Sequence, residues 1–227
     1  MIRISFFFLV VLGLTGICTK LLKLETYFNI FLGLFIPVLM VYYVGKKKNQ
    51  NLDIENAVIG GLILLFTSDI LELSYFKDFA FKDKIQIVLH LLVQFLFLKV
   101  FRKEGAILVQ ESKVDVLKIF VPVLIIFLMF GYFVFEENEI VNYFLMIAFA
   151  IQLAIFLILT MFRPVNNYSF YFGVAGVSFL LLYGLFYFLF SFGPNYKTFY
   201  DRSFSFYVFS QVFLIESFST NVKTRNE

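Results

Sequence analysis

The sequence of 227 residues has few of the side chains from which metal and cofactor sites are usually built, and it has no tryptophan. A single cysteine excludes a disulfide within the chain. One cysteine and one histidine are also too few for the ligand patterns of zinc or iron–sulfur sites, so we expect no metal and no cofactor. The net charge is only +3 and the one basic run is short, so we expect no nucleic acid as a partner.

Charge of either sign is scarce, and apolar residues take its place. Charged residues make up 15% and hydrophobic residues 61% of the chain, whereas a typical soluble domain has about 25% and roughly 45–50%. This composition predicts an all-α polytopic membrane protein, a bundle of about eight transmembrane helices in one domain covering 1–227. Eight apolar stretches approach the length of about 20 residues that a helix needs to cross a bilayer, at 4–22, 27–45, 56–76, 85–101, 116–135, 141–162, 169–191 and 204–220.

Lysine and arginine are distributed unevenly between the two sides of this bundle. Twelve of the 19 fall on the side of both termini and seven on the other side. Because cytoplasmic loops carry the excess, we expect an integral protein of a bacterial inner membrane with both termini cytoplasmic. The first stretch has features of a signal sequence, but Ile17 before Cys18 is a poor cleavage position. We therefore expect a retained first helix with Cys18 buried in it.

A few polar residues lie inside the apolar stretches, where a charge costs about 2.5–3.5 kcal/mol. Asp69 and Glu72 lie three residues apart in the third stretch, on one face of the predicted helix. If that helix ends at residue 76, Asp69 lies roughly 10 Å from its end. His90, about five residues into the fourth stretch, would lie at a similar depth. The two acids and the histidine are therefore expected to meet in one pocket.

Two further polar features leave alternatives open. Gln86, His90 and Gln94 are spaced four apart and predict a polar stripe along one helix. Such a stripe fits either a hydrogen-bonded cluster that stabilises the bundle or a functional pocket. Glu216, near the cytoplasmic end of the last stretch, is either structural or reaches toward the headgroups, where Lys223 or Arg225 would screen it.

The two halves of the chain show a weak internal similarity. The segment 57–73 has a counterpart in 172–188, and 84–98 has one in 203–218. Four helices per unit would give the two units the same orientation in the membrane. We therefore predict two four-helix repeats, 1–112 and 113–227.

Several of these features occur together in one known family. They are Ser68-Asp69-Ile70-Leu71 at the end of the third helix, His90-Leu91-Leu92 in the fourth, Pro37 in the second, the small residues Gly173 and Gly176 in the seventh, and Gln211 in the last. In this order and spacing the chain resembles the YhhN or lysoplasmalogenase-like membrane proteins. The resemblance implies an eight-helix bundle. It also implies hydrolysis of the vinyl ether bond of lysoplasmalogens, with release of a fatty aldehyde and a glycerophospho-alcohol.

The resemblance also implies roles for individual residues, with a membrane lysophospholipid as the substrate. Asp69 would transfer a proton to the vinyl ether, because a carboxyl group at low dielectric constant can stay protonated near neutral pH. His90 would position water or the headgroup, and Glu72 would tune Asp69. The candidate substrate-binding residues are Ser68, Gln86, Gln94 and Gln211.

The chain departs from the family pattern at three places, which leaves two other functions open. It has Ile36 where the family often has Lys, Val93 where an aromatic residue is expected, and Tyr183-Gly184 where a second Ser-Asp often stands. One alternative is a proton-coupled transporter with Asp69, Glu72 and His90 as a relay. The other is a family member without catalytic activity, whose pocket between the third, fourth, seventh and eighth helices would be filled by Phe and Tyr side chains.

Overall fold

The computed structural model describes residues 4–47, 51–76, 79, 81–108, 112–134, 140–192 and 197–220. This part of the chain is helical, as the sequence predicts, with a short 3-10 helix, Ser74–Phe76, after the third α-helix. Its eight α-helices are α1 (Phe6–Leu21), α2 (Glu25–Lys46), α3 (Leu52–Leu71), α4 (Lys82–Lys103), α5 (Lys113–Val134), α6 (Ile140–Met161), α7 (Asn167–Phe192) and α8 (Lys197–Thr220).

Among the described residues, five helices are long and apolar enough to cross a membrane. These are α2, α3, α4, α6 and the segment Asn167–Tyr187 of α7, with mean hydropathies of 1.6 to 2.6 over their most apolar windows. Large apolar side chains also remain exposed on the outer faces of helices, such as Phe7 on α1 and Phe127 on α5. The protein is therefore a helical integral membrane protein.

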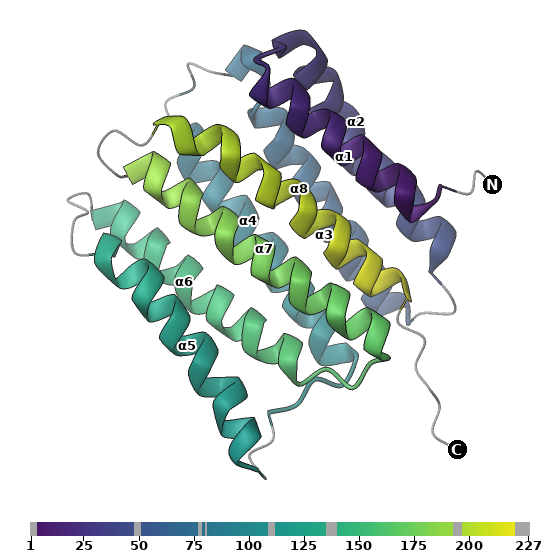
Figure 1. Ribbon diagram of the computed structural model, residues 1–227, viewed down its shortest axis with the longest axis vertical. Coiled ribbons are helices and arrows are strands. Elements are labelled where there is room, and N and C mark those ends of the chain that lie inside the picture. The colour runs from purple at the N-terminus through teal and green to yellow at the C-terminus, as the bar shows by residue number, and fades with distance from the viewer. Residues whose placement is uncertain are drawn as a thin grey trace.

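The helices form two layers (Figure 1). One layer contains α2, α3 and α4, and the other contains α8, α7 and α6. The layers join at both edges, because α2 packs against α8 and α4 packs against α6. Outside them, α1 packs against α2 and α8, and α5 packs against α6 and α7. The interior between α3–α4 and α7–α8 is therefore enclosed on all sides by helices.

The packing of α7 against α8 depends on a small residue. A Cβ atom at Gly176 would lie 2.8 Å from Cγ and 2.9 Å from the backbone nitrogen of Leu214. Small residues allow helices in membranes to approach until their backbones touch. This contact fixes α8 against α7 and directs the opposite face of α8 toward α3 and α4.

The third helix begins and ends earlier than the apolar pattern predicts, at Leu52–Leu71 instead of 56–76. Asn51 caps the start of the helix by accepting a hydrogen bond from the backbone nitrogen of Asp53. Acidic residues are favourable in the first turn of a helix, but they interrupt an apolar stretch, so the apolar pattern places the start of this helix too late. The apolar residues after Leu71 form the 3-10 turn instead. Glu72 is consequently the C-cap residue and not part of the helix interior, and Asp69 lies about 3 Å from the helix end, not 10 Å.

Cys18 is exposed, so the expectation that it is buried is wrong. The buried face of α1 carries Leu9, Gly13, Gly16 and Ile17, and it packs against the rest of the bundle. Cys18 points away from that face because successive residues of a helix are about 100° apart.

Glu216 is fully buried and joins three helices at the end of the bundle where α1 begins and α8 ends. Lys46 Nζ donates to its Oε1 at 2.5 Å, the Tyr168 hydroxyl donates to the same oxygen at 2.9 Å, and the Tyr42 hydroxyl donates to its Oε2. Of the two roles left open by the sequence, the structure supports the structural one. Lys223 and Arg225, together with Arg3, Lys48 and Lys77 of the charge count, lie outside the described residues.

A second ion pair lies at the same end of the bundle, and in this one both side chains are buried. The sequence patterns do not predict it. Arg163, after α6, donates from Nε to Glu104 Oε2 at 2.7 Å, and both side chains are at most 1% exposed. Its Nη1 donates to Ser217 Oγ at 2.8 Å. The guanidinium also lies over the ring of Phe101, 4.3 Å from the ring centroid. These contacts connect the ends of α4, α6 and α8.

Candidate functional site

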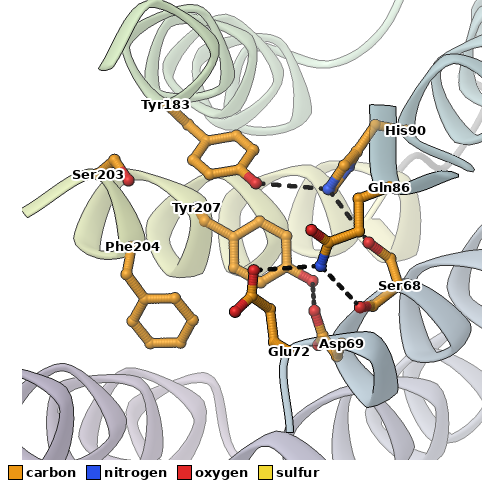
Figure 2. A pocket seen from close by; sticks show the side chains of 9 residues that line it. All are labelled: Ser68, Asp69, Glu72, Gln86, His90, Tyr183, Ser203, Phe204 and Tyr207. Carbon is orange, nitrogen blue, oxygen red and sulfur yellow. Dashed lines mark hydrogen bonds between the residues drawn. The ribbon is translucent and has the colours of Figure 1, made fainter. Parts of the chain in front are cut away.

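A polar pocket lies between α3, α4, α7 and α8, near the end of the bundle opposite these two ion pairs (Figure 2). It encloses a cavity of about 20 Å³, which is room for a single water molecule. The lining residues are Ser68, Asp69 and Glu72 from the end of α3, Gln86 and His90 from α4, Tyr183 from α7, and Ser203, Phe204 and Tyr207 from α8. The two acids and the histidine therefore do meet in one pocket.

Asp69 is the most deeply placed acid of this pocket, with 5% of its surface exposed. The hydroxyl of Tyr207 donates to its Oδ1 at 2.7 Å. Its Oδ2 is buried and has no hydrogen-bond partner among the described residues. A buried carboxyl oxygen without a partner is costly, because it has lost the hydrogen bonds that water would supply. Asp69 thus has one carboxyl oxygen without a hydrogen-bond partner and lines a cavity with room for one water molecule.

His90 lies across the cavity among hydroxyl groups. Its Nε2 is 3.5 Å from Ser68 Oγ and 3.4 Å from the hydroxyl of Tyr183, both at the long limit for a hydrogen bond. The imidazole packs edge-on against the ring of Tyr207, with the ring centroids 6.0 Å apart. The imidazole is therefore placed by two long polar contacts and by the rings of Tyr183 and Tyr207.

Glu72 lies at the edge of the pocket, where it is partly exposed. Gln86 Nε2 donates to Glu72 Oε1 and to the backbone oxygen of Ser68, each at 3.2 Å. Lys82 Nζ donates to Glu72 Oε2 at 3.2 Å. Gln86 and Lys82 therefore connect the start of α4 to the end of α3.

Two of the predicted substrate-binding residues do not line the cavity. Gln94 and Gln211 are each 1% exposed and lie one helical turn beyond His90 and Tyr207. Gln211 Nε2 donates to Ser210 Oγ at 3.1 Å, while neither amide atom of Gln94 has a hydrogen-bond partner in the described part of the chain. Of the four predicted substrate-binding residues, only Ser68 and Gln86 lie at the cavity.

Aromatic residues of the second half complete the pocket. The sequence predicts Phe and Tyr side chains there only for an inactive family member, and it does not single out Tyr183 or Tyr207. Tyr207 could have been found, because it precedes Gln211 by four residues and so shares its helix face. Tyr183 stands at one of the departures from the family pattern. Its neighbour Gly184 faces α6, where a Cβ atom would lie 2.6 Å from the ring of Phe149. An acidic side chain at position 184 would therefore point toward α6 and not into this cavity.

The described residues bring together no group of three His, Cys, Asp or Glu side chains that could hold a metal ion. What they do bring together is two carboxyl groups, an imidazole and two phenol hydroxyls around space for one water molecule. Groups of this kind exchange protons with each other and with water, so the pocket can support proton transfer.

Comparison with protein-family models, with curated proteins and with solved structures finds no match to this chain.

Replacing Gln94 separates a substrate-binding role from a packing role. We expect Gln94→Leu to raise the free energy of unfolding by about 1 kcal/mol, because a leucine of similar size removes two buried amide atoms that lack partners. Gln86→Leu should do the opposite, since it removes two hydrogen bonds. Thermal unfolding in detergent measures both changes. A Gln94→Leu protein of unchanged stability with impaired turnover would instead assign Gln94 to substrate binding.

Proposed function

We propose that this protein is a membrane-embedded hydrolase of the lysoplasmalogenase type, which cleaves the vinyl ether bond of a lysophospholipid. The observation that carries the proposal is the environment of Asp69, whose buried carboxyl group lines a water-sized cavity. One of its oxygens accepts a hydrogen bond from Tyr207, and the other has no hydrogen-bond partner among the described residues. This reaction needs one acid and one water molecule, and the pocket has the acid and enough space for the water molecule. The resemblance to the YhhN family supports the same assignment.

In the proposed reaction, Asp69 transfers its proton to the β carbon of the vinyl ether. The double-bond electrons form the new C–H bond, and an oxocarbenium-like cation results at the carbon next to the ether oxygen. The Asp69 carboxylate stabilises this cation, as a carboxylate does in glycoside hydrolysis. Water positioned by His90 adds to the cation and returns a proton to Asp69. The resulting hemiacetal breaks into the fatty aldehyde and the glycerophospho-alcohol.

The size of the cavity adds a requirement to this mechanism. A space of about 20 Å³ admits water and not a lipid, so a bound lysophospholipid has to displace side chains of the lining. Phe204 is the lining side chain without a polar group. We propose that substrate binding moves it and opens the pocket to the chain of the lipid.

The same pocket supports a second candidate, a proton-coupled transporter. Asp69 and His90 lie inside the bundle and Glu72 lies at its partly exposed edge, next to Lys82. A series of titratable groups from an edge inward is typical of proton pathways in membranes.

A non-catalytic role is the third candidate, and it also has an observation in its favour. Tyr183, Phe204 and Tyr207 line the pocket between α3, α4, α7 and α8, which is the aromatic filling expected of an inactive family member. The hydroxyls of the two tyrosines nevertheless point to His90 and Asp69, which simple filling does not require (Figure 2).

One assay on purified protein in liposomes distinguishes the three candidates. The liposomes contain lysoplasmalogens with choline or ethanolamine headgroups and an internal pH-sensitive dye. A hydrolase releases fatty aldehyde without an imposed pH gradient and leaves the internal pH unchanged. A transporter moves protons when a gradient is imposed and releases no aldehyde. If neither signal exceeds that of protein-free liposomes, the hydrolase proposal fails and the non-catalytic role stands.

The finer membrane topology belongs to the same proposal. We infer that all eight helices cross the membrane, that both ends of the chain are cytoplasmic, and that the membrane is a bacterial inner membrane. The excess of lysine and arginine on the side of the termini supports this orientation. The pocket would then lie near the outer face, and the ion pairs of Glu216 and Glu104 would lie near the cytoplasmic face.

A further inference from the structure

An open groove of about 520 Å³ lies between α4 and α6, near the end of α4 and away from the pocket. Its apolar part is formed by Phe95 and Leu98 of α4 and by Ile155 and Leu159 of α6. Phe95 is 63% exposed and Ile155 is 44% exposed, so the groove opens sideways from the bundle. In a membrane-spanning helix pair, this side faces the lipid.

A hydrogen bond joins the two helices at the inner end of the groove. Gln152 Nε2 of α6 donates to the backbone oxygen of Leu91 of α4 at 2.8 Å. Leu91 precedes Phe95 by four residues and Gln152 precedes Ile155 by three, so this bond lies one helical turn deeper than the groove. The helices are therefore held together at that level. Nearer the end of α4 they are joined again, by the stacked rings of Phe101 and Phe156 and by the Glu104–Arg163 ion pair, so the groove lies on the outer side of a packed helix pair.

The outer part of the groove is basic. Lys99, Arg102 and Lys103 line it, and all three are exposed. Lys103 donates to Asp53 Oδ2 at 2.8 Å, so one carboxylate offsets part of this charge. In the part of the chain that the structure describes, Arg102 has no acidic partner, and the neighbouring Glu104 is bound to Arg163. Three cations against one carboxylate leave the groove positively charged.

The spacing of these residues matches the depth profile of a bilayer leaflet. On α4, Phe95 and Lys103 are eight residues apart, which is about 12 Å along the helix axis. The cations thus lie at the helix end, at the level of the headgroups, and the apolar residues lie below them in the hydrocarbon region. We propose that this groove binds an anionic phospholipid of the surrounding bilayer, with its phosphate at Lys99, Arg102 and Lys103 and an acyl chain along Phe95 and Ile155.

The absence of tryptophan allows a direct test, because one introduced tryptophan reports on the groove alone. Phe95→Trp places the reporter in the groove, and Phe144→Trp on α6 is the matched control at a position that is also 63% exposed. Each protein is reconstituted into phosphatidylcholine vesicles to which phosphatidylglycerol or phosphatidylcholine with brominated chains is added. We expect brominated phosphatidylglycerol to quench the tryptophan at position 95 at a mole fraction at least fivefold lower than brominated phosphatidylcholine. The tryptophan at position 144 should show no such preference.

Additional variants assign the preference to the basic part of the groove. In the Phe95→Trp protein, Arg102→Ala with Lys99→Ala should remove the preference, whereas Lys113→Ala, at the same end of the bundle, should leave it unchanged. Inorganic phosphate at millimolar concentration should not relieve the quenching. Equal quenching by both lipids, loss of the preference on Lys113→Ala, or relief by inorganic phosphate would each overturn the proposal. The first two outcomes would indicate ordinary lipid contact or general surface charge, and the third a site for free anions.

Discussion

Asp69→Asn is expected to lower the release of fatty aldehyde from a lysoplasmalogen by about 10²–10⁴-fold, the usual contribution of a positioned general acid. An amide has the shape of the carboxyl group but no acidic proton to transfer to the vinyl ether. Its oxygen can still accept the hydrogen bond from Tyr207, so the substitution should not disturb the fold. Turnover is measured on purified protein in detergent, with aldehyde as the readout.

The control makes the same chemical change at another carboxyl group. Asp115, in the first turn of α5, accepts hydrogen bonds from Ser112 and Lys118 far from the pocket. Asp115→Asn should retain full turnover. If Asp69→Asn elutes as a folded protein and turns over substrate at the rate of Asp115→Asn, Asp69 is not the proton donor and the proposed mechanism is wrong.

Arg163→Leu is expected to lower the free energy of unfolding by about 3–5 kcal/mol, the largest stability effect that we predict for one substitution. The change leaves Glu104 charged and buried, with its ion-pair partner removed. It also removes the hydrogen bond to Ser217 and the contact with the ring of Phe101. A fall in the thermal unfolding midpoint in detergent, with loss of monodisperse protein, measures the effect.

A double variant tests whether the isolated charge causes this loss. Replacing a buried ion pair by apolar residues is often neutral, so Arg163→Leu combined with Glu104→Leu should recover most of the lost stability. Gly173 limits this repair, because it leaves space for the guanidinium that a shorter side chain does not fill. A double variant no more stable than Arg163→Leu alone would show that the arginine stabilises the fold through its packing and not through its charge.

The apolar pattern was sufficient to predict eight helices because a bilayer-length helix needs a continuous apolar run, which is visible without any partner. It was less accurate at helix ends. Glu72 counted as part of a helix because Leu73, Tyr75 and Phe76 are apolar, although the chain turns there. The convergence of Asp69, Glu72 and His90 was also predictable, because a short connection brings the end of one helix next to the start of the following one.

Contacts between distant helices could not be predicted in the same way. Tyr207 is 138 residues from Asp69, and Lys46 is 170 residues from Glu216. No periodicity in either segment specifies its partner, since many rotations of a helix in a bundle bury a similar apolar area. The two repeats remain a prediction. The packing of α3 on α4 and of α7 on α8 agrees with it without testing it.

The contacts that α8 makes with α2 and α3 of the other layer have a consequence for how the protein is made. A ribosome adds about 5–20 residues per second, so Tyr207 is synthesised roughly 7–28 s after Asp69. During that interval α3 carries its buried acid, and α2 carries Lys46, without the partners that α8 later provides. Until α8 packs against them, the polar side chains of both helices must be solvated by water or lipid headgroups or bound by the insertion machinery. Entry of α8 is therefore the step that commits the chain to its final assembly.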